Sequence, residues 1–410
     1  MSRPKTHGSG GVSRLRLAAT SAVAALALNF APVAHAQTPT PSGSSVGAPA
    51  PSGGAGATGG TSGLSPWFSD IAFSAQFQGG IMFNPRPGPG ERNFGQLTTD
   101  HANQFQLNQL LLTAQKAIDP KETDYAFGFK FQLLYGSDVR IFQYLGQFNH
   151  VTSDRYQLQI LEANVSLHLP WLTEGGIDAK VGQYASPLGV ETIDPSTTPF
   201  YSHSYIFQFG VPFVHTGVLT QTHVTPELGL YFGIDSGVNT WLGSGDNNGR
   251  AAGIAGFNLS LLDGKVTVVA LTHIGPENPS RTVPNANSAQ RYLNDVAVTY
   301  KATDKLTLTT EGNYIRDDAF HADGWGIAQY ASYTLTETLT LNGRAEIWRD
   351  NKGFFVAEFP GNRDFVNFQR GFPATVISAR PTTYSEFTVG LTYKPGLPAP
   401  VSNLMIRPEV

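Results

Sequence analysis

Hydrophobic and polar residues alternate with a period of two along most of the chain after residue 66, which predicts β-strands with one apolar and one polar face. The clearest run covers residues 125–135, and the pattern recurs at 305–314 and 339–348. In the first run, one parity carries Tyr125, Phe127, Phe129, Phe131, Leu133 and Tyr135, and the other carries Ala126, Gly128, Lys130 and Gln132. Weaker runs lie at 71–83, 163–169, 177–181, 228–234 and 387–393.

Alternation alone does not distinguish a transmembrane barrel from a soluble sandwich, because a sandwich strand also has one polar face. Three features favour the barrel. Charged residues keep to the polar parity, as expected where a lipid-facing Lys or Arg costs ~2–4 kcal/mol. The runs reach the ~9–11 residues of a tilted transmembrane strand, and short connections alternate with long ones, as in outer-membrane barrels. We therefore predict an all-β fold, a transmembrane antiparallel β-barrel.

The number of strands is odd. Counting the runs gives about fifteen, whereas bacterial single-chain barrels have an even number. The last run, at 404–410, has strand-like alternation and then the chain stops. We therefore expect sixteen strands in the complete protein and a chain here that lacks the last of them. We also expect a gap, or only partial pairing, between the runs at 71–83 and 404–410.

The N-terminal residues have the pattern of a secretory signal. Basic residues precede the apolar run at 17–28, and Ala34-His35-Ala36 supplies small residues before Gln37. The apolar run is shorter than the ~20 residues of a membrane-spanning helix. The next segment is rich in Gly, Ser, Ala, Pro and Thr and buries too little apolar surface to fold. The expected domains are a signal peptide at 1–36, a disordered linker at 37–66 and a barrel at 67–410, with 1–63 outside the barrel.

Composition narrows the function further. The chain has no cysteine, which excludes disulfides, thiolate metal sites and cysteine catalysis. The formal net charge is −4 with both signs mixed, so no basic surface predicts nucleic-acid binding. We expect no cofactor.

Residues 181–219 read VGQYASPLGVETIDPSTTPFYSHSYIFQFGVPFVHTGVL. This block resembles the OmpL-like β-barrel porin-2 family, whose members carry a similar G-[KQ]-x-x-[ST]-x-x-G-x-E-x-x-D-P…YSHS…G-x-P-x-x-H-T-G-V-L pattern. Shorter pieces agree, namely Leu107-Asn108-Gln109-Leu110, YAFGFKFQLLYGSDVR at 125–140 and Ile406-Arg407-Pro408-Glu409. The resemblance covers most of the chain after the linker and implies an outer-membrane barrel with pore activity, without assigning a solute. Family members usually continue past the last piece into one more strand that ends in an aromatic residue.

The long external loop predicted at 184–215 combines acids, hydroxyls and imidazoles. Its candidate residues are Glu191, Asp194, Tyr201, Ser202, His203, Ser204 and His215. A hydrolase would use Ser202 or Ser204 as nucleophile, His203 or His215 as base and Asp194 to orient the base, but no G-x-S-x-G elbow is present. A metal site would use His203, His215 and His223, which lack a ligand-spaced pair. We therefore predict no catalytic and no metal site, but an ordered loop that contacts the wall through His203 or His215 and narrows the pore.

The polar parity predicts which side chains face the lumen. These are Lys130, Glu162, Asp178, Lys180, Lys305, Glu311, Arg344, Glu346 and Glu386. Such charges set the field that a passing solute meets, although each of them can also simply pair with a neighbouring strand. The opposite parity should face lipid, and its clearest members are Phe127, Phe129, Phe131, Leu306, Leu308, Leu341 and Ile347.

These features predict a porin in the outer membrane of a Gram-negative bacterium, which lets small hydrophilic solutes or ions diffuse passively through a polar lumen. Its expected partners are outer-membrane lipid and those solutes. A homotrimer is compatible with the sequence, but nothing in the sequence demands one. The alternative is a barrel without a transport role, such as an outer-membrane hydrolase or an adhesive scaffold.

Overall fold

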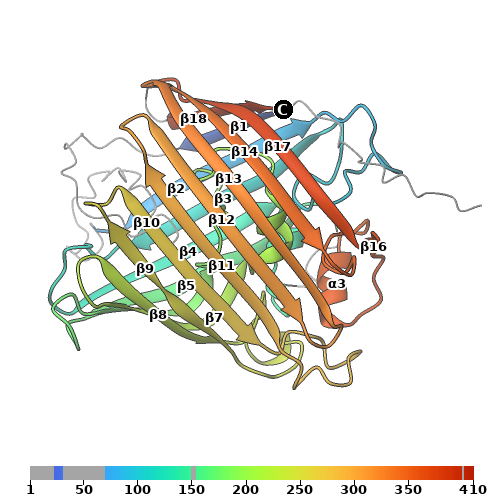
Figure 1. Cartoon of the computed structure of the whole chain (residues 1–410), viewed down its shortest axis with the longest axis horizontal. Helices are drawn as coiled ribbons and strands as arrows, with labels where there is room; N and C mark the ends of the chain where they lie inside the picture. The colour runs from blue at the N-terminus through green and yellow to red at the C-terminus, as the bar shows by residue number, and fades with distance from the viewer. Residues whose placement is uncertain (1–22, 31–69, 149–153, 399–400) are drawn as a thin grey trace, which may run out of the picture.

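The structure, a computed structural model, describes residues 23–30, 70–148, 154–398 and 401–410. Within these residues, sixteen strands pair edge to edge into one closed antiparallel barrel (Figure 1). The strands of the barrel are β1 (Val23–Phe30), β2 (Ala72–Met82), β3 (Phe105–Lys116), β4 (Ala126–Gly136), β5 (Gln157–Leu169), β6 (Ile177–Ala185), β7 (Val214–His223), β8 (Leu228–Asp235), β9 (Ala252–Leu261), β10 (Val266–Gly275), β11 (Arg291–Lys301), β12 (Leu306–Asp317), β13 (Ala322–Thr336), β14 (Leu339–Asp350), β17 (Thr382–Tyr393) and β18 (Val401–Glu409).

The remaining elements are short and lie in the connections. They are the helical turns α2 (Val139–Phe142), η1 (Ile206–Gly210) and η2 (Gly243–Gly245), the helix α3 (Asp364–Arg370), and a small sheet of β15 (Ala357–Glu358) with β16 (Ile377–Ser378). The helix α3 ends at Gly371, whose left-handed backbone (φ 70°) lets its N–H reach the carbonyls of Asn367 and Phe368. Among the described residues, no helix has the length and apolar character needed to cross a membrane.

Connections at the two ends of the barrel differ in length. One end, the short-turn end, has tight turns such as 224–227, 262–265 and 337–338. In the turn at 262–265, Leu262 and Asp263 both adopt positive φ (51° and 54°), as a turn that matches the twist of a hairpin requires. The other end, the long-loop end, carries the loops 83–104, 137–156, 186–213, 236–251, 276–290 and 351–381. The predicted alternation of short and long connections is confirmed for the connections that follow β2, with the exception of β12–β13, which has a short turn at the long-loop end.

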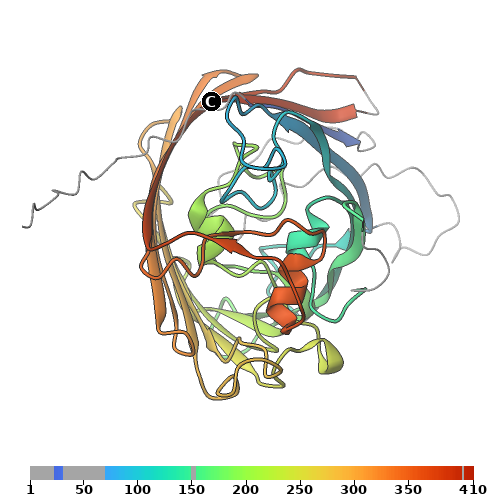
Figure 2. The same ribbon diagram turned by 90° about the vertical axis from the view of Figure 1, so that its right-hand side faces the viewer.

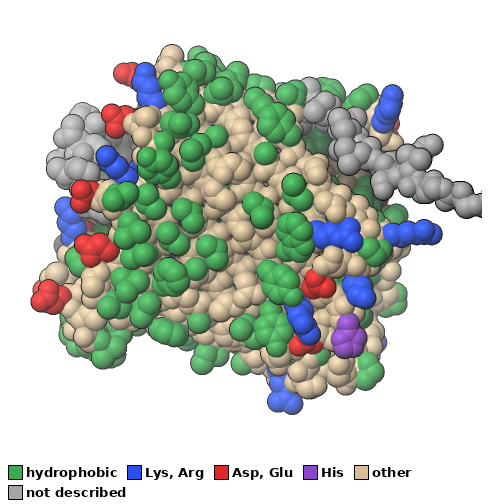
Figure 3. All heavy atoms as spheres, viewed as in Figure 1, with side chains coloured by type: hydrophobic (Ala, Val, Ile, Leu, Met, Phe, Trp, Pro, Cys, Tyr) green, Lys and Arg blue, Asp and Glu red, His purple; other side chains and the backbone are tan. Residues whose placement is uncertain are grey.

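Side chains alternate between the two faces of the wall as the sequence predicted. Phe127, Phe131, Leu341 and Ile347 are exposed on the outer face, and Phe129, Leu306 and Leu308 are half-exposed on the same parity. Figure 3 shows hydrophobic side chains spread over the wall, with charged side chains gathered towards its two ends. An apolar belt between two polar rims is the surface that a bilayer requires of a barrel.

The closing strand of the barrel differs from the sequence-based expectation. We expected residues 1–63 outside the barrel, but Val23–Phe30 forms β1, which pairs antiparallel with both β2 and β18. The edges of β2 and β18 would otherwise leave N–H and C=O groups without partners, at several kcal/mol each in lipid. An apolar segment satisfies both edges, and the barrel reaches an even number of strands. β2 and β18 do not pair with each other, but β1 fills the gap that we expected between them, and the barrel is closed.

Two further expectations concern the N-terminal segment. The rest of the predicted signal peptide, and all of the predicted linker at 37–66, lie outside the described residues. Both therefore stay predictions.

Candidate functional site in the barrel interior

The loop 186–213 lies inside the barrel. Figure 2 shows its green segment, with the turn η1, within the ring of strands. The turn η1 contacts β12 and β13 on the inner wall, and Ile206, Phe207 and Val211 belong to the buried hydrophobic cluster. The predicted loop bounds of 184–215 were slightly too wide, because Tyr184 and Ala185 still pair in β6, and Val214 and His215 already pair in β7.

Wall carboxylates hold the backbone of this loop. Three Glu residues on different strands accept hydrogen bonds from loop N–H groups, two of them through both carboxylate oxygens. The bonds run from Val190 to Glu311 (2.8 Å), from Tyr201 and Ser202 to Glu409 (2.8 and 2.9 Å), and from Tyr205 and Ile206 to Glu346 (2.7 and 2.8 Å). These bonds satisfy N–H groups that the loop's own backbone leaves without partners.

A buried ion cluster joins the loop to β14 and β17. The guanidinium of Arg344 lies 2.8 Å from Oε1 of Glu191 in the loop and also pairs with Glu386 on β17. Arg344 also donates to the carbonyl (3.1 Å) and hydroxyl (3.0 Å) oxygens of Ser202. On the other side of Glu191, Nδ1 of His203 lies 2.6 Å from Oε2. Burial alone would raise the pKa of Glu191, but Arg344 and His203 lower it to about 2.

The last strand supplies a second arginine. Arg407 on β18 is buried (1% exposed) and donates from one nitrogen to the carbonyl oxygens of Pro195 (2.8 Å), Thr198 (2.7 Å) and Phe200 (3.1 Å). Neither Arg407 nor Glu409 was among the predicted lumen-facing residues. Their parity in the run at 404–410, opposite to Ile406, was the signal that could have placed them inside.

Charged residues on β4–β7 have different surroundings. Nζ of Lys130 lies 2.7 Å from Oε1 of Glu162 on the neighbouring strand. Near the short-turn end, Asp178 lies between His168 (2.7 Å) and His223 (2.8 Å) and is 46% exposed. Lys180, half-buried on β6, interacts through space with Glu162. These side chains line the interior without touching the loop 186–213.

One predicted lumen residue lies elsewhere. Lys305 is an exposed residue of the turn before β12, where its N–H donates to the hydroxyl of Thr303 (3.2 Å). The strand β12 starts at Leu306, one residue later than the alternation suggested. The hydroxyl of Thr303 fixes the turn, so Lys305 sits at the rim instead of on the wall.

The predicted nucleophiles do not meet the predicted bases. Ser202 accepts from Arg344, and the hydroxyl of Ser204 accepts the N–H of Phe207 (3.0 Å). Asp194 instead accepts from Gln76 on β2 (3.0 Å). The three histidines considered for a metal are also apart, since each faces its own acid: His203 faces Glu191, His215 faces Asp235 and His223 faces Asp178.

A Ser–His contact does occur, at a residue that sequence reasoning did not select. Nε2 of His215 lies 3.1 Å from the hydroxyl of Ser186, and its Nδ1 lies 3.3 Å from Oδ2 of Asp235. The same hydroxyl accepts the N–H of Leu188 (3.2 Å). The side chains of His215 and Asp235 are completely buried.

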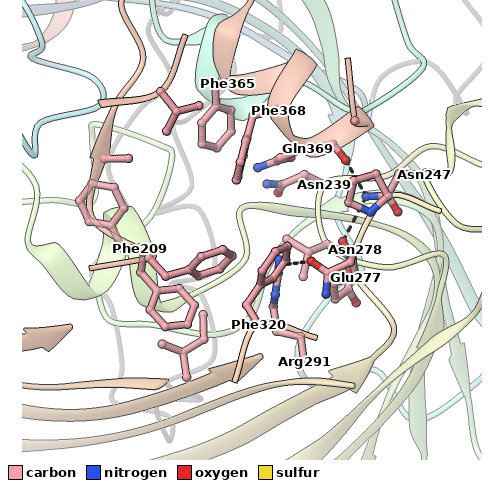
Figure 4. A pocket seen from close by; sticks show the side chains of 18 of the residues that line it. Phe209, Asn239, Asn247, Glu277, Asn278, Arg291, Phe320, Phe365, Phe368 and Gln369 are labelled. Carbon is pink, nitrogen blue, oxygen red and sulfur yellow. Dashed lines mark hydrogen bonds between the residues drawn. The ribbon is translucent and has the colours of Figure 1, made fainter. Parts of the chain in front are cut away.

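A cavity of about 270 Å³ lies at the long-loop end, where residues from several loops meet (Figure 4). Phenylalanines form one side of it, including Phe209, Phe320, Phe365 and Phe368, and a polar group of Asn247, Glu277, Asn278 and Arg291 forms the other. Burial raises the pKa of Glu277 to about 7. Sequence reasoning missed this cavity because its lining comes from separate loops, although six Phe residues between 354 and 372 were a signal.

Comparison with known proteins gives a family. Residues 70–410 match the family described as "Putative beta-barrel porin-2, OmpL-like". No curated protein sequence matches the chain.

Several solved outer-membrane proteins have a similar structure. They include the channel DcaP of Acinetobacter baumannii (11% identity, TM-score 0.49, covering 83% of this chain and 97% of that one). Others are OmpF of Salmonella typhi in complex with daunomycin (9%, 0.45, 95% and 95%) and OprB of Pseudomonas putida (10%, 0.42, 95% and 92%). The fold follows from the strand pairing itself.

Proposed function

The chain belongs to the OmpL-like beta-barrel porin-2 family, and from this premise we propose that it lets small hydrophilic solutes or ions diffuse passively across the outer membrane. The route is the polar interior of the barrel, narrowed by the loop 186–213. Support for the narrowing comes above all from one observation, the set of backbone N–H groups of this loop that donate to Glu311, Glu346 and Glu409 on the wall.

Anchoring of this kind suits a passive channel. A loop fixed at several points keeps one cross-section, so the size limit for solutes stays constant without any input of energy. Charged side chains of both signs on β4–β7 then provide the field that a passing ion meets. We place the predicted pore residues Glu191, Asp194, Tyr201, Ser202, His203 and Ser204 in this constriction, the half-buried Asp194 on its surface and the five buried residues as the anchors behind it.

Planar-bilayer recording of the full chain tests the proposal. We expect stepwise single-channel currents that follow the voltage linearly, and an upper size limit when neutral sugars of increasing radius are added. Replacing residues 192–200 with a short Gly-Ser segment should increase both the conductance and the size limit. The matched control replaces residues 284–288, which lie in another long loop, and should change neither. A barrel that inserts without conducting would contradict the proposal, and an unchanged size limit in the first variant would remove the loop from the constriction.

A barrel hydrolase is the second candidate, and it has support only from the contact of Ser186 with His215. Ser186 lines neither the cavity described above nor a second hollow beside β8. Covalent labelling with a fluorophosphonate decides this point. Labelling that disappears in Ser186→Ala would support the hydrolase, and absence of labelling in the conducting protein would exclude it.

A further inference from the structure

Two histidines and an aspartate from three strands converge inside the wall near the long-loop end. They are His215 on β7, Asp235 at the end of β8 and His273 on β10, and all three side chains are completely buried. One nitrogen or oxygen atom from each lies within 4.8 Å of the others. We propose that these three residues bind one divalent transition-metal ion of the Zn²⁺ type.

The distances agree with shared coordination. Nδ1 of His215 lies 3.3 Å from Oδ2 of Asp235, and Nε2 of His273 lies 3.1 Å from Oδ1 of the same carboxylate. Ligand atoms that each lie ~2.0–2.2 Å from a tetrahedral Zn²⁺ are separated from one another by about 3.3 Å. Imidazole nitrogen and carboxylate oxygen are also the ligands that this ion accepts besides thiolate, and thiolate is absent from a chain without cysteine.

The cluster has acceptor atoms without partners. Within the described parts of the chain, neither Nδ1 of His215 nor Oδ2 of Asp235 has a hydrogen-bond partner, although the two atoms lie 3.3 Å apart. Buried polar atoms normally have a partner, and an ionised carboxylate deep in a protein needs compensation for its charge. A divalent cation between these two atoms would use both lone pairs and offset the charge of Asp235.

The outer nitrogens of the two imidazoles face polar groups, as metal-bound histidines require. Nε2 of His215 lies 3.1 Å from the hydroxyl of Ser186. Nδ1 of His273 lies 3.7 Å from Oε1 of Glu277, an oxygen with no hydrogen-bond partner of its own in the described chain. Coordination through Nε2 would leave the proton of His273 on Nδ1, directed at Glu277. The site thus has both its ligands and the groups that would orient them.

Glu277 also provides a way in. Its carboxylate lines the aromatic cavity at the long-loop end (Figure 4) and faces His273 with one oxygen. Its other oxygen accepts the N–H of Val238 (2.7 Å), which holds the group in place. An ion that enters the cavity therefore meets this carboxylate before it reaches the three ligands.

Zinc titration of the full chain in detergent tests the proposal. The protein is stripped with a chelator, and Zn²⁺ is then added in competition with a chromophoric chelator. We expect one ion per chain, and Co²⁺ in its place should give the visible absorption of a tetrahedral site. Asp235→Asn, which keeps the shape of the side chain, should weaken binding more than ~100-fold, and Glu277→Gln should weaken it ~10–100-fold, the usual loss for an orienting partner.

His223→Gln is the matched control. It removes a histidine that also faces a carboxylate but lies near the short-turn end, and it should leave Zn²⁺ binding unchanged. Heat-modifiable migration in a gel reports whether each variant is folded, and the Co²⁺ spectrum of the unaltered protein gives an answer even if Asp235→Asn fails to fold. Less than half an ion per chain in the unaltered protein would overturn the proposal, as would full binding by folded Asp235→Asn. Neither result affects the conductance expected of a porin.

Discussion

Lys130 on β4 and Arg344 on β14 both point into the barrel, yet their surroundings differ. The side chain of Lys130 is 24% exposed and pairs with a residue of the adjacent strand, whereas that of Arg344 has no exposed area and pairs with Glu191 in the loop. The wall β4–β7 thus leaves Lys130 partly open to solvent and free of the loop, and the wall β12–β18 uses its charged residues to hold the loop 186–213. Both residues were predicted to face inwards from the same alternation of polar and apolar residues. An inward-facing position alone therefore does not show whether a charged side chain is accessible to a solute.

The two arrangements also differ in energy. A partly exposed ion pair contributes at most about 1 kcal/mol, because water already solvates both partners. Removing one partner of a buried pair costs about 3–5 kcal/mol, because the other charge is left buried without compensation. The difference predicts that substitutions on the two walls have separable effects on stability and on ion permeation.

The largest effect is expected from Arg344→Met. This change removes the arginine partner of the buried Glu191 and the half-buried Glu386, and should lower the free energy of unfolding by about 3–5 kcal/mol. It should also release the loop, so that proteases cut within 186–213 and the channel current becomes noisier. Urea unfolding and limited proteolysis of the detergent-solubilised protein measure these effects. A loop that stays resistant to proteolysis in a destabilised barrel would show that Arg344 does not hold it.

Acid should release the loop only at very low pH. The pKa of Glu191 falls from an ordinary 4.5 to about 2 on folding, so its ionised form stabilises the protein fully above pH 4.5. This contribution is lost as the pH falls from about 4.5 towards 2. We expect the loop to remain resistant to an acid protease at pH 4 and to become sensitive near pH 2. Glu191→Gln removes this titration, and a sensitivity that rises equally in that variant would assign the transition to other groups.

Lys130→Met should have a moderate effect on stability and a clear one on permeation. Lys130 is partly exposed and the buried Glu162 keeps Lys180 nearby, so the expected loss is about 1–2 kcal/mol. Removal of a positive charge from the accessible wall should raise the permeability ratio of cations to anions, which the reversal potential in a salt gradient measures. Arg344→Lys, which keeps a charge on the buried wall, is the comparison. An unchanged reversal potential in Lys130→Met would place the ion path away from β4.

The smallest effect is expected from Asp178→Asn. Its carboxylate is 46% exposed and faces two histidines, so the change in stability should be below about 0.5 kcal/mol. Thermal unfolding of the variant in detergent checks this. A loss comparable to that of Arg344→Met would mean that the accessible wall is as dependent on its charges as the wall beneath the loop.

The sequence predicted the barrel well because its constraint is local. Lipid on one side of the wall forces a period of two. The run at 125–135 alone therefore fixes which side chains of β4 face lipid and which face the interior. The interior could not be predicted in the same way. Glu191 meets Arg344, and Tyr201 meets Glu409, only after a loop folds back across the barrel, and no periodicity records such a contact.

Two errors have the same origin. The segment 23–30 was expected outside the barrel because an apolar run suits a signal sequence as well as a strand, and its pairing with β2 and β18 could not be read from its composition. His215 was considered with His203 and His223, whereas its neighbours in space are Asp235 and His273. These partners come from other strands, and strand order around a barrel cannot be read from residue types within one segment.

The bonds from the wall carboxylates to the loop have a consequence for evolution. Glu311, Glu346 and Glu409 accept from peptide N–H groups, which every residue except proline provides. Substitutions at the donor positions of the loop can therefore alter the lining of the pore while the attachment persists. Each of the three glutamates, by contrast, cannot be replaced without loss of an anchor. The residues that attach the loop and the residues that set selectivity are thus different. Selectivity can therefore change during evolution while the attachment of the loop is kept.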